Sequence, residues 1–241
     1  GLVWCWGANG FYQLGNAEIG QSLVPLQADQ LSEPAAALGA GGLHTCVRTA
    51  AGVVKCWGQD TWGQLGDGEP KVDQAQPVSV LNLAAGAVFG SGTAHNCAVS
   101  EGALRCWGVN FYGQLGDGGF AVQSAPVDVS GFAGTAQAVS AGDRHTCALT
   151  DAGGVQCWGA NARGQLGDGG NSTQLTPVQA AGLNTGVAAV DAGYRHTCAL
   201  TTTGGVKCWG DNTYGQLGTR QYNVPVGVFS EVRVMLPIIY R

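Results

Sequence analysis

The feature that most constrains this chain is a repeat of about fifty residues. The tripeptide Cys-Trp-Gly begins at five positions, separated by 51, 50, 51 and 51 residues: Cys5, Cys56, Cys106, Cys157 and Cys208. A Gln-Leu-Gly tripeptide keeps the same spacing, as does a histidine in four of the repeats. A fixed period of this length indicates an architecture in which each repeat is one supersecondary unit.

Each repeat contains four short segments that have the character of β-strands. They are an apolar run such as 187–190, a His-Thr-Cys-Ala-Leu segment, a Val-Gln-Cys-Trp segment and a Pro-Val segment such as 177–178. The 41 glycines fall in turns between such runs and lack the triplet period of collagen. We therefore predict an all-β fold, a β-propeller of four-stranded blades. It would form one domain, 1–241, with a partial blade at 1–34 and repeat units at 35–85, 86–135, 136–186 and 187–230.

The segment from Gly142 to Gly167 carries the most complete copy of the repeat. Gly-x-x-His-Thr is followed there by Ala-Leu, Gly-x-Val, Trp-Gly and Gly-Gln-Leu-Gly. In these motifs the chain resembles the regulator of chromosome condensation repeat family, and its paired cysteines resemble bacterial-type extracytoplasmic members. The resemblance covers nearly the whole chain and implies a β-propeller with blades of about fifty residues.

In four repeats a second cysteine precedes the Cys-Trp-Gly cysteine by ten or nine residues. A hairpin that turns at 151–154 would place Cys147 opposite Cys157 on neighbouring strands, within reach of a disulfide. We predict four such bonds and one cysteine that is unpaired or intermolecular: Cys46–Cys56, Cys97–Cys106, Cys147–Cys157 and Cys198–Cys208, with Cys5 left over. Reduced core thiols are one alternative. Zinc is another, bound by His145 together with Cys147 and Cys157, although no fourth ligand recurs.

Four disulfides would place the protein outside a reducing cytosol, as a secreted, periplasmic or cell-surface protein. This compartment differs from that of the nuclear members of the family. Asn171 begins an Asn-Ser-Thr glycosylation sequon on a predicted loop, which has meaning only in a glycosylating cell.

The other repeated side chains are expected to be structural, because a catalytic residue is normally unique in its chain. We expect buried imidazoles, hydrogen-bonded to backbone at the seams between blades, at His44, His95, His145 and His196. We expect indoles packed between blades at Trp6, Trp57, Trp107, Trp158 and Trp209. We expect turns rather than calcium sites at Asp67, Asp117 and Asp168, because one carboxylate per loop supplies too few oxygen ligands.

Composition and motifs argue against several classes of function. The chain has 11 Lys+Arg against 16 Asp+Glu and a formal charge of −5, with no basic cluster for nucleic acid. It has no apolar run long enough for a membrane span, and Gly1 begins directly in patterned sequence rather than in a signal peptide. It has no Gly-x-Ser-x-Gly elbow, P-loop or unique Ser/His/Asp set, so we expect neither catalysis nor a cofactor.

The segments after Gln-Leu-Gly differ between repeats in length, charge and aromatic content: 68–76, 118–125, 169–176 and 219–224. Variable loops on a constant frame predict a non-catalytic scaffold that binds a protein through its rim. The family resemblance adds a secreted enzyme inhibitor as an alternative. Exchange of nucleotide on a small GTPase fits poorly with an acidic chain in an oxidising compartment. Ultraviolet-B reception would need tryptophans where this chain has Asp143 and Tyr194.

The two ends of the chain are out of phase with the repeat. Residues 1–5 align with 153–157, so the sequence begins at the turn into the third strand of a blade. The segment 231–241 alternates apolar and polar residues and is expected to be a closing or pairing strand. The result would be four complete blades plus a partial fifth, in which Cys5 lacks its facing cysteine. Either the chain is a piece of a larger propeller, or another polypeptide, such as a second copy, donates the strand in an exchanged assembly or filament.

Overall fold

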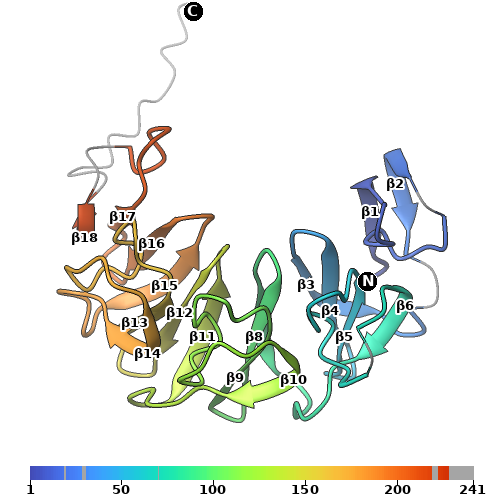
Figure 1. The fold of residues 1–241 in the computed structure, drawn as a ribbon, viewed down its shortest axis with the longest axis horizontal. Coiled ribbons are helices and arrows are strands. Elements are labelled where there is room, and N and C mark those ends of the chain that lie inside the picture. The colour runs from blue at the N-terminus through green and yellow to red at the C-terminus, as the bar shows by residue number, and fades with distance from the viewer. Residues whose placement is uncertain (19, 29–30, 70, 219–221, 228–241) are drawn as a thin grey trace, which may run out of the picture.

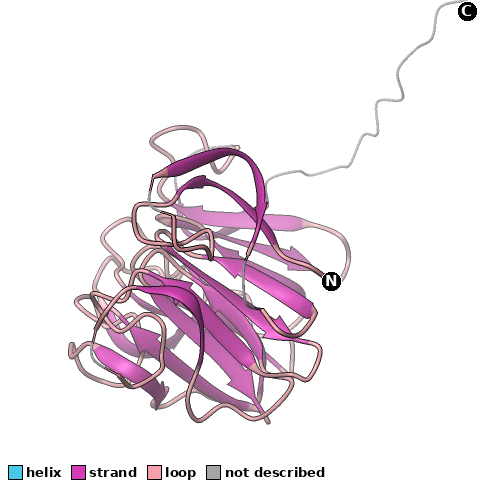
Figure 2. Cartoon of the chain, turned by 90° about the vertical axis from the view of Figure 1, so that its right-hand side faces the viewer, coloured by secondary structure: helices cyan, strands magenta, loops and turns pink. Residues whose placement is uncertain are grey.

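A computed structural model describes residues 1–18, 20–28, 31–69, 71–218 and 222–227. The described chain forms eighteen β-strands and contains no helix (Figure 2). The strands make five antiparallel sheets that stand side by side in an arc (Figure 1). The predicted all-β propeller fold, with four complete blades plus a partial fifth, is therefore confirmed.

The strands follow one another through the blades in sequence order. Blade 1 contains two strands, β1 (Trp4–Ala8) and β2 (Gln21–Gln27). Blade 2 contains β3 (Ala35–Ala40), β4 (His44–Thr49), β5 (Val54–Gly58) and β6 (Gln74–Ser79). Blade 3 contains β7 (Val88–Ser91), β8 (His95–Ser100), β9 (Ala103–Gly108) and β10 (Gln123–Asp128). Blade 4 contains β11 (Ala136–Ala141), β12 (His145–Thr150), β13 (Val155–Gly159) and β14 (Gln174–Gln179). Blade 5 contains β15 (Val187–Ala192), β16 (His196–Thr201), β17 (Val206–Gly210) and β18 (Tyr222–Gly227).

Tight turns between the second and third strands set the register inside each blade. In blade 4 the hairpin pairs Cys147 with Cys157 and His145 with Gly159. Blades 2, 3 and 5 repeat this pairing. In blades 2 to 5 the first strands of consecutive blades contact one another, so they line the inner side of the arc, and the fourth strands form its outer rim.

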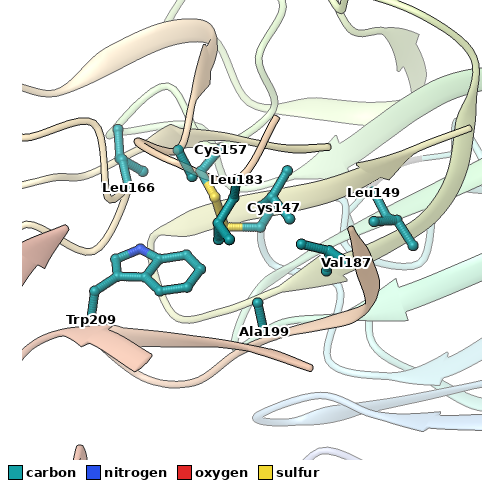
Figure 3. Close-up of a cluster of buried hydrophobic side chains, with 10 residues drawn as sticks. Cys147, Leu149, Cys157, Leu166, Leu183, Val187, Ala199 and Trp209 are labelled. Carbon is teal, nitrogen blue, oxygen red and sulfur yellow. A yellow bond between two sulfur atoms is a disulfide. The ribbon is translucent and has the colours of Figure 1, made fainter. Parts of the chain in front are cut away.

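The hydrophobic core lies between blades. At the seam between blades 4 and 5, Trp209 and Ala199 of blade 5 pack against the Cys147–Cys157 disulfide and Leu166 of blade 4 (Figure 3). The other three seams also contain the tryptophan of the following blade: Trp57, Trp107 and Trp158. All four indoles are fully buried. Each blade therefore shares a buried core with its neighbours, as expected for a repeat protein.

Both ends of the arc present uncovered side chains. Blade 1 lies at one end and blade 5 at the other (Figure 1). Leu200 of blade 5 is 43% exposed, whereas its equivalent Leu149 is 8% exposed because blade 5 covers it. The predicted closing strand at 231–241 lies outside the described residues.

Candidate functional site

The four expected disulfides are present in the hairpins of blades 2 to 5: Cys46–Cys56, Cys97–Cys106, Cys147–Cys157 and Cys198–Cys208. Their sulfur atoms are bonded to each other, so the thiolates that the zinc alternative needed are not free. Among the described residues, no group of three His, Cys, Asp or Glu side chains is placed to hold a metal ion. Cys5 is the free cysteine.

A hydrogen-bonded bridge joins each blade to the next. The hydroxyl of Thr197 and the indole Nε1 of Trp209, both in blade 5, donate to the carbonyl oxygen of Gln165 in blade 4, at 2.8 and 2.9 Å. At the other three seams the tryptophan indole likewise donates to the backbone carbonyl of the glutamine in the preceding blade: Gln13, Gln64 and Gln114. A Cβ at Gly167 would lie 2.6 Å from the Trp209 Nε1 atom, and its φ of +70° also favours glycine. This contact explains the glycine that ends Gln-Leu-Gly.

The histidines extend these bridges, but not as the sequence predicted. Nε2 of His145 lies 2.9 Å from the Thr197 hydroxyl, and Nε2 of His95 lies 2.9 Å from that of Thr146. The expected backbone partner was wrong, because the Trp and Thr donors already occupy the available glutamine carbonyl. At the seam of blades 2 and 3, Asn96 replaces threonine, and its amide oxygen lies 3.0 Å from Nε2 of His44.

Two side chains at the ends of the arc differ from their equivalents. His196 is only partly buried, because no described blade follows blade 5. Trp6 was expected to pack between blades but is 63% exposed, because no described blade precedes blade 1. The buried state of the repeated His and Trp side chains therefore depends on a neighbouring blade.

The loop aspartates form turns. The Asp117 and Asp168 carboxylates accept the backbone N–H of Gly119 and Gly170, each at 2.9 Å. Asp67 accepts that of Glu69 at 3.2 Å. These bonds hold the loops that lead to the fourth strands.

A cluster of exposed aromatic and arginine side chains lies where these loops begin. Because His145 pairs with Gly159, the turn before each second strand and the loop after each third strand leave the same end of the blade. At this end two side-chain pairs link three successive blades, and we call the four residues together the aromatic cluster: Trp62 with Phe111, and Tyr112 with Arg144.

The aromatic cluster has a defined geometry. The rings of Trp62 and Phe111 meet edge to face, with centroids 5.1 Å apart. The Arg144 guanidinium lies 4.6 Å from the centroid of the Tyr112 ring and donates to the Tyr112 hydroxyl at 2.7 Å. Asp143 fixes the same guanidinium through an ion pair of 3.1 Å. Trp62 is still 39% exposed and Phe111 is 52% exposed, so the cluster is both ordered and accessible.

The sequence pattern of the regulator of chromosome condensation (RCC1) repeat matches residues 1–48, 101–149 and 152–200, and a second version of it matches 136–165 and 187–216. These matches cover more than half of the chain. The chain belongs to the RCC1 repeat family.

Two curated proteins are among those similar to the chain. The chain is 35% identical over 224 residues to the ultraviolet-B receptor UVR8 of Arabidopsis thaliana, covering 90% of the chain and 51% of that protein. It is 32% identical to the E3 ubiquitin-protein ligase HERC2 of Mus musculus, covering 74% of the chain and 4% of that protein. The chain thus spans about half the length of the first relative and a small part of the second.

Solved structures confirm the fold. Prp20p of Saccharomyces cerevisiae superposes with a TM-score of 0.81 at 22% identity, over 95% of this chain and 59% of that one. Human WBSCR16 gives the same TM-score at 24% identity, over 94% of this chain and 62% of that one. None of the described segments is an apolar helix of membrane-spanning length.

The aromatic cluster is a candidate site that the repeat pattern alone did not predict. The predicted variable surface lies after Gln-Leu-Gly, whereas Trp62, Phe111 and Tyr112 come just before it. A signal was present: the position before Gly-Gln-Leu-Gly holds Trp62, Tyr112, Arg163 and Tyr214 in successive repeats. Only the contacts between blades show that residues of blades 2, 3 and 4 pair at this end.

Proposed function

We propose that this protein is a non-catalytic extracytoplasmic scaffold that binds a protein partner through the aromatic cluster and the loops around it. The observation that carries the proposal is the pair of contacts that crosses two successive seams, Trp62 with Phe111 and Tyr112 with Arg144. Tryptophan, tyrosine and arginine dominate the binding energy of protein interfaces, most of all when they are held in place before binding. The blades beneath them supply that rigidity.

The buried disulfides support the compartment. Each bond lies in a β-hairpin, and both sulfur-bearing residues of Cys147–Cys157 are fully buried in the seam. Disulfides of this structural kind persist in secreted, periplasmic and surface proteins and are rare in a reducing cytosol.

One structural neighbour supports a protein as the class of partner. Yeast RCC1, Prp20, has been crystallised with Kap60 bound to it. At 21% identity this neighbour shares the fold, and the identity of its partner does not transfer to this chain.

The test compares two variants by capture from the extracytoplasmic fraction of the source cells, with quantitative mass spectrometry. Trp62→Ala combined with Phe111→Ala should lose a specific protein that the unchanged chain retains. The control is Val53→Ala, which removes a similarly exposed side chain (38%) from the opposite end of blade 2. Thermal melting should show that both variants stay folded. If both variants retain the same proteins as the unchanged chain, the aromatic cluster is not the binding site.

A second candidate function is self-association through the uncovered edge of β1. In the described chain β1 pairs only with β2, and a cavity of about 370 Å³ borders it, lined by Trp4, Cys5, Trp6, Leu38 and His44 among others. Because the other eight cysteines form intrachain bonds, the sulfur partner of Cys5 in a second copy would be that copy's Cys5. Antiparallel pairing of two β1 edges would give a symmetric dimer rather than the expected filament.

A further inference from the structure

One polar position beneath the loops differs in blade 2 alone. Its side-chain oxygen accepts the backbone N–H of the leucine in Gln-Leu-Gly in all five blades, at 2.9 or 3.0 Å. The residue is asparagine in four blades and aspartate in blade 2: Asn9, Asp60, Asn110, Asn161 and Asn212. Because Oδ1 makes the same bond throughout, the Oδ2 atom of Asp60 occupies the place of an amide nitrogen.

In blades 1, 3 and 4 that nitrogen is a donor to the loop. Nδ2 of Asn110 donates to the Asp117 carboxylate at 3.0 Å and to the Gly119 carbonyl at 3.1 Å. Nδ2 of Asn161 makes the same two bonds to Asp168 and Gly170, at 2.9 and 3.2 Å. The amide thus ties the loop aspartate to the end of the third strand.

Blade 2 has a carboxylate on both sides of this contact. Asp67 is the equivalent of Asp117, so Asp60 Oδ2 stands where Asp117 would meet an amide N–H. Asp60 has no exposed surface, and its Oδ2 atom has no hydrogen-bond partner in the described part of the chain. A buried oxygen in this position lacks a donor unless it carries a proton itself.

The charged groups around Asp60 favour that proton. Burial raises the pKa of Asp60 to about 6, the Leu65 N–H opposes this, and the charges of Asp67 and Asp73 raise the pKa further while Lys71 lowers it. Asp73 lies beside Asp60: its carboxylate accepts the backbone N–H of Asp60 at 2.8 Å.

We propose that a proton on Oδ2 of Asp60, donated to Asp67, replaces the asparagine amide and holds the 60–69 loop with Trp62 in its place in the aromatic cluster. Trp62 lies two residues from Asp60, in a turn closed by the Gly63 N–H to the Asp60 carbonyl at 2.9 Å. Loss of the proton leaves two facing carboxylates and loosens this turn. The consequence for partner binding rests on the proposed function, but the proton and the movement of Trp62 do not.

The test uses the isolated protein and NMR of the aspartate carboxyl carbons across the acid-to-neutral range. One carboxyl should titrate near pH 6 and disappear in Asp60→Asn, and the Trp62 indole resonance, assigned with Trp62→Phe, should move with the same midpoint. Asp60→Asn restores the residue of the other four blades, so it should fold and hold the indole resonance at one position across this range. The proposal would be overturned if no aspartate carboxyl titrated near pH 6, or if the indole shift persisted in Asp60→Asn.

Two further measurements sharpen the result. The pKa of Asp60 is higher in the folded chain than in the unfolded chain. The bound proton therefore stabilises the fold fully below the unfolded-state pKa, and this stabilisation is lost as the pH rises through about 6. Asp60→Asn should therefore melt higher than the unchanged protein at neutral pH, with the difference shrinking on acidification. Adding calcium chloride at neutral pH should leave the Trp62 resonance unmoved. A calcium-dependent shift that Asp60→Asn abolishes would identify a cation, not a proton, as the bridge.

Discussion

The imidazole Nε2 of His145 in blade 4 contacts the hydroxyl of Thr197 in blade 5 at 2.9 Å. Because that hydroxyl donates its proton to the Gln165 carbonyl, it must accept one from His145, which fixes the imidazole as the Nε2–H tautomer. The same reasoning holds at Asn96, whose amide nitrogen donates to the Gln64 carbonyl. Its amide oxygen can therefore only accept, so Nε2 of His44 is the donor. The seam therefore has one defined direction of hydrogen bonding.

Replacing Thr197 with valine should cost about 1 to 3 kcal/mol of unfolding free energy. The valine fills the same volume but leaves Nε2 of His145 without an acceptor in a buried site. Thr197→Ser keeps the hydroxyl and should recover most of the loss, apart from one buried methyl. Urea unfolding of both variants gives the comparison, and equal stabilities for valine and serine would show that the bridge contributes nothing.

Acidification should destabilise the fold through the seam histidines. Burial, and then the charge of neighbouring histidines, lowers the pKa of His95 and of His145 to about 3, against an ordinary value of 6.5. A lowered histidine pKa means that the unfolded chain takes up protons first, so stability is full above about pH 6.5 and is lost as pH falls toward 3.

Unfolding free energies measured at several pH values test this in the Asp60→Asn background, because Asp60 acts in the opposite direction. His145→Gln should reduce the steepness of the loss below pH 6.5. A stability that stays constant across the acid range would contradict neutral, buried imidazoles.

Each disulfide should contribute about 2 to 3 kcal/mol by the chain-entropy estimate for loops of ten residues. Cys147→Ala with Cys157→Ala should therefore lower the unfolding free energy by at least that amount, since both side chains also pack against Trp209. Peptide mapping without reduction should recover four linked pairs and alkylated Cys5. Alkylation of all nine cysteines would remove the main support for the extracytoplasmic assignment.

Cys5→Ser tests the self-association candidate. Burial raises the pKa of the Cys5 thiol, so it should react slowly with small reagents and pair only when a strand aligns beside β1. The unchanged protein, incubated in air at high concentration, should form a reducible dimer that Cys5→Ser abolishes. Only monomer under these conditions would contradict pairing through β1.

The repeat and the hairpins could be predicted from sequence because they depend on local spacing. Cys147 and Cys157 are ten residues apart, and a tight turn between them leaves few ways to pair the strands. The period of the repeat then implies the same pairing in every blade.

The partners across seams could not be predicted in the same way. The Thr197 hydroxyl, the Gln165 carbonyl and the Trp209 indole come together only when two blades pack. The aromatic cluster likewise joins Trp62 of blade 2 to Phe111 of blade 3. Asp60 was visible in the sequence as a departure from asparagine, but its meaning required the bonds that the asparagines make.

Hydrogen–deuterium exchange on the complex with the captured partner is the most direct test of the central claim, that the aromatic cluster is the binding surface. Binding should slow exchange in the loops that carry Trp62, Phe111 and Arg144, and leave the turns at the opposite end of the blades, such as the one at Ala152 and Gly153, unchanged. Protection confined to those opposite turns, or to the edge of β1, would contradict it.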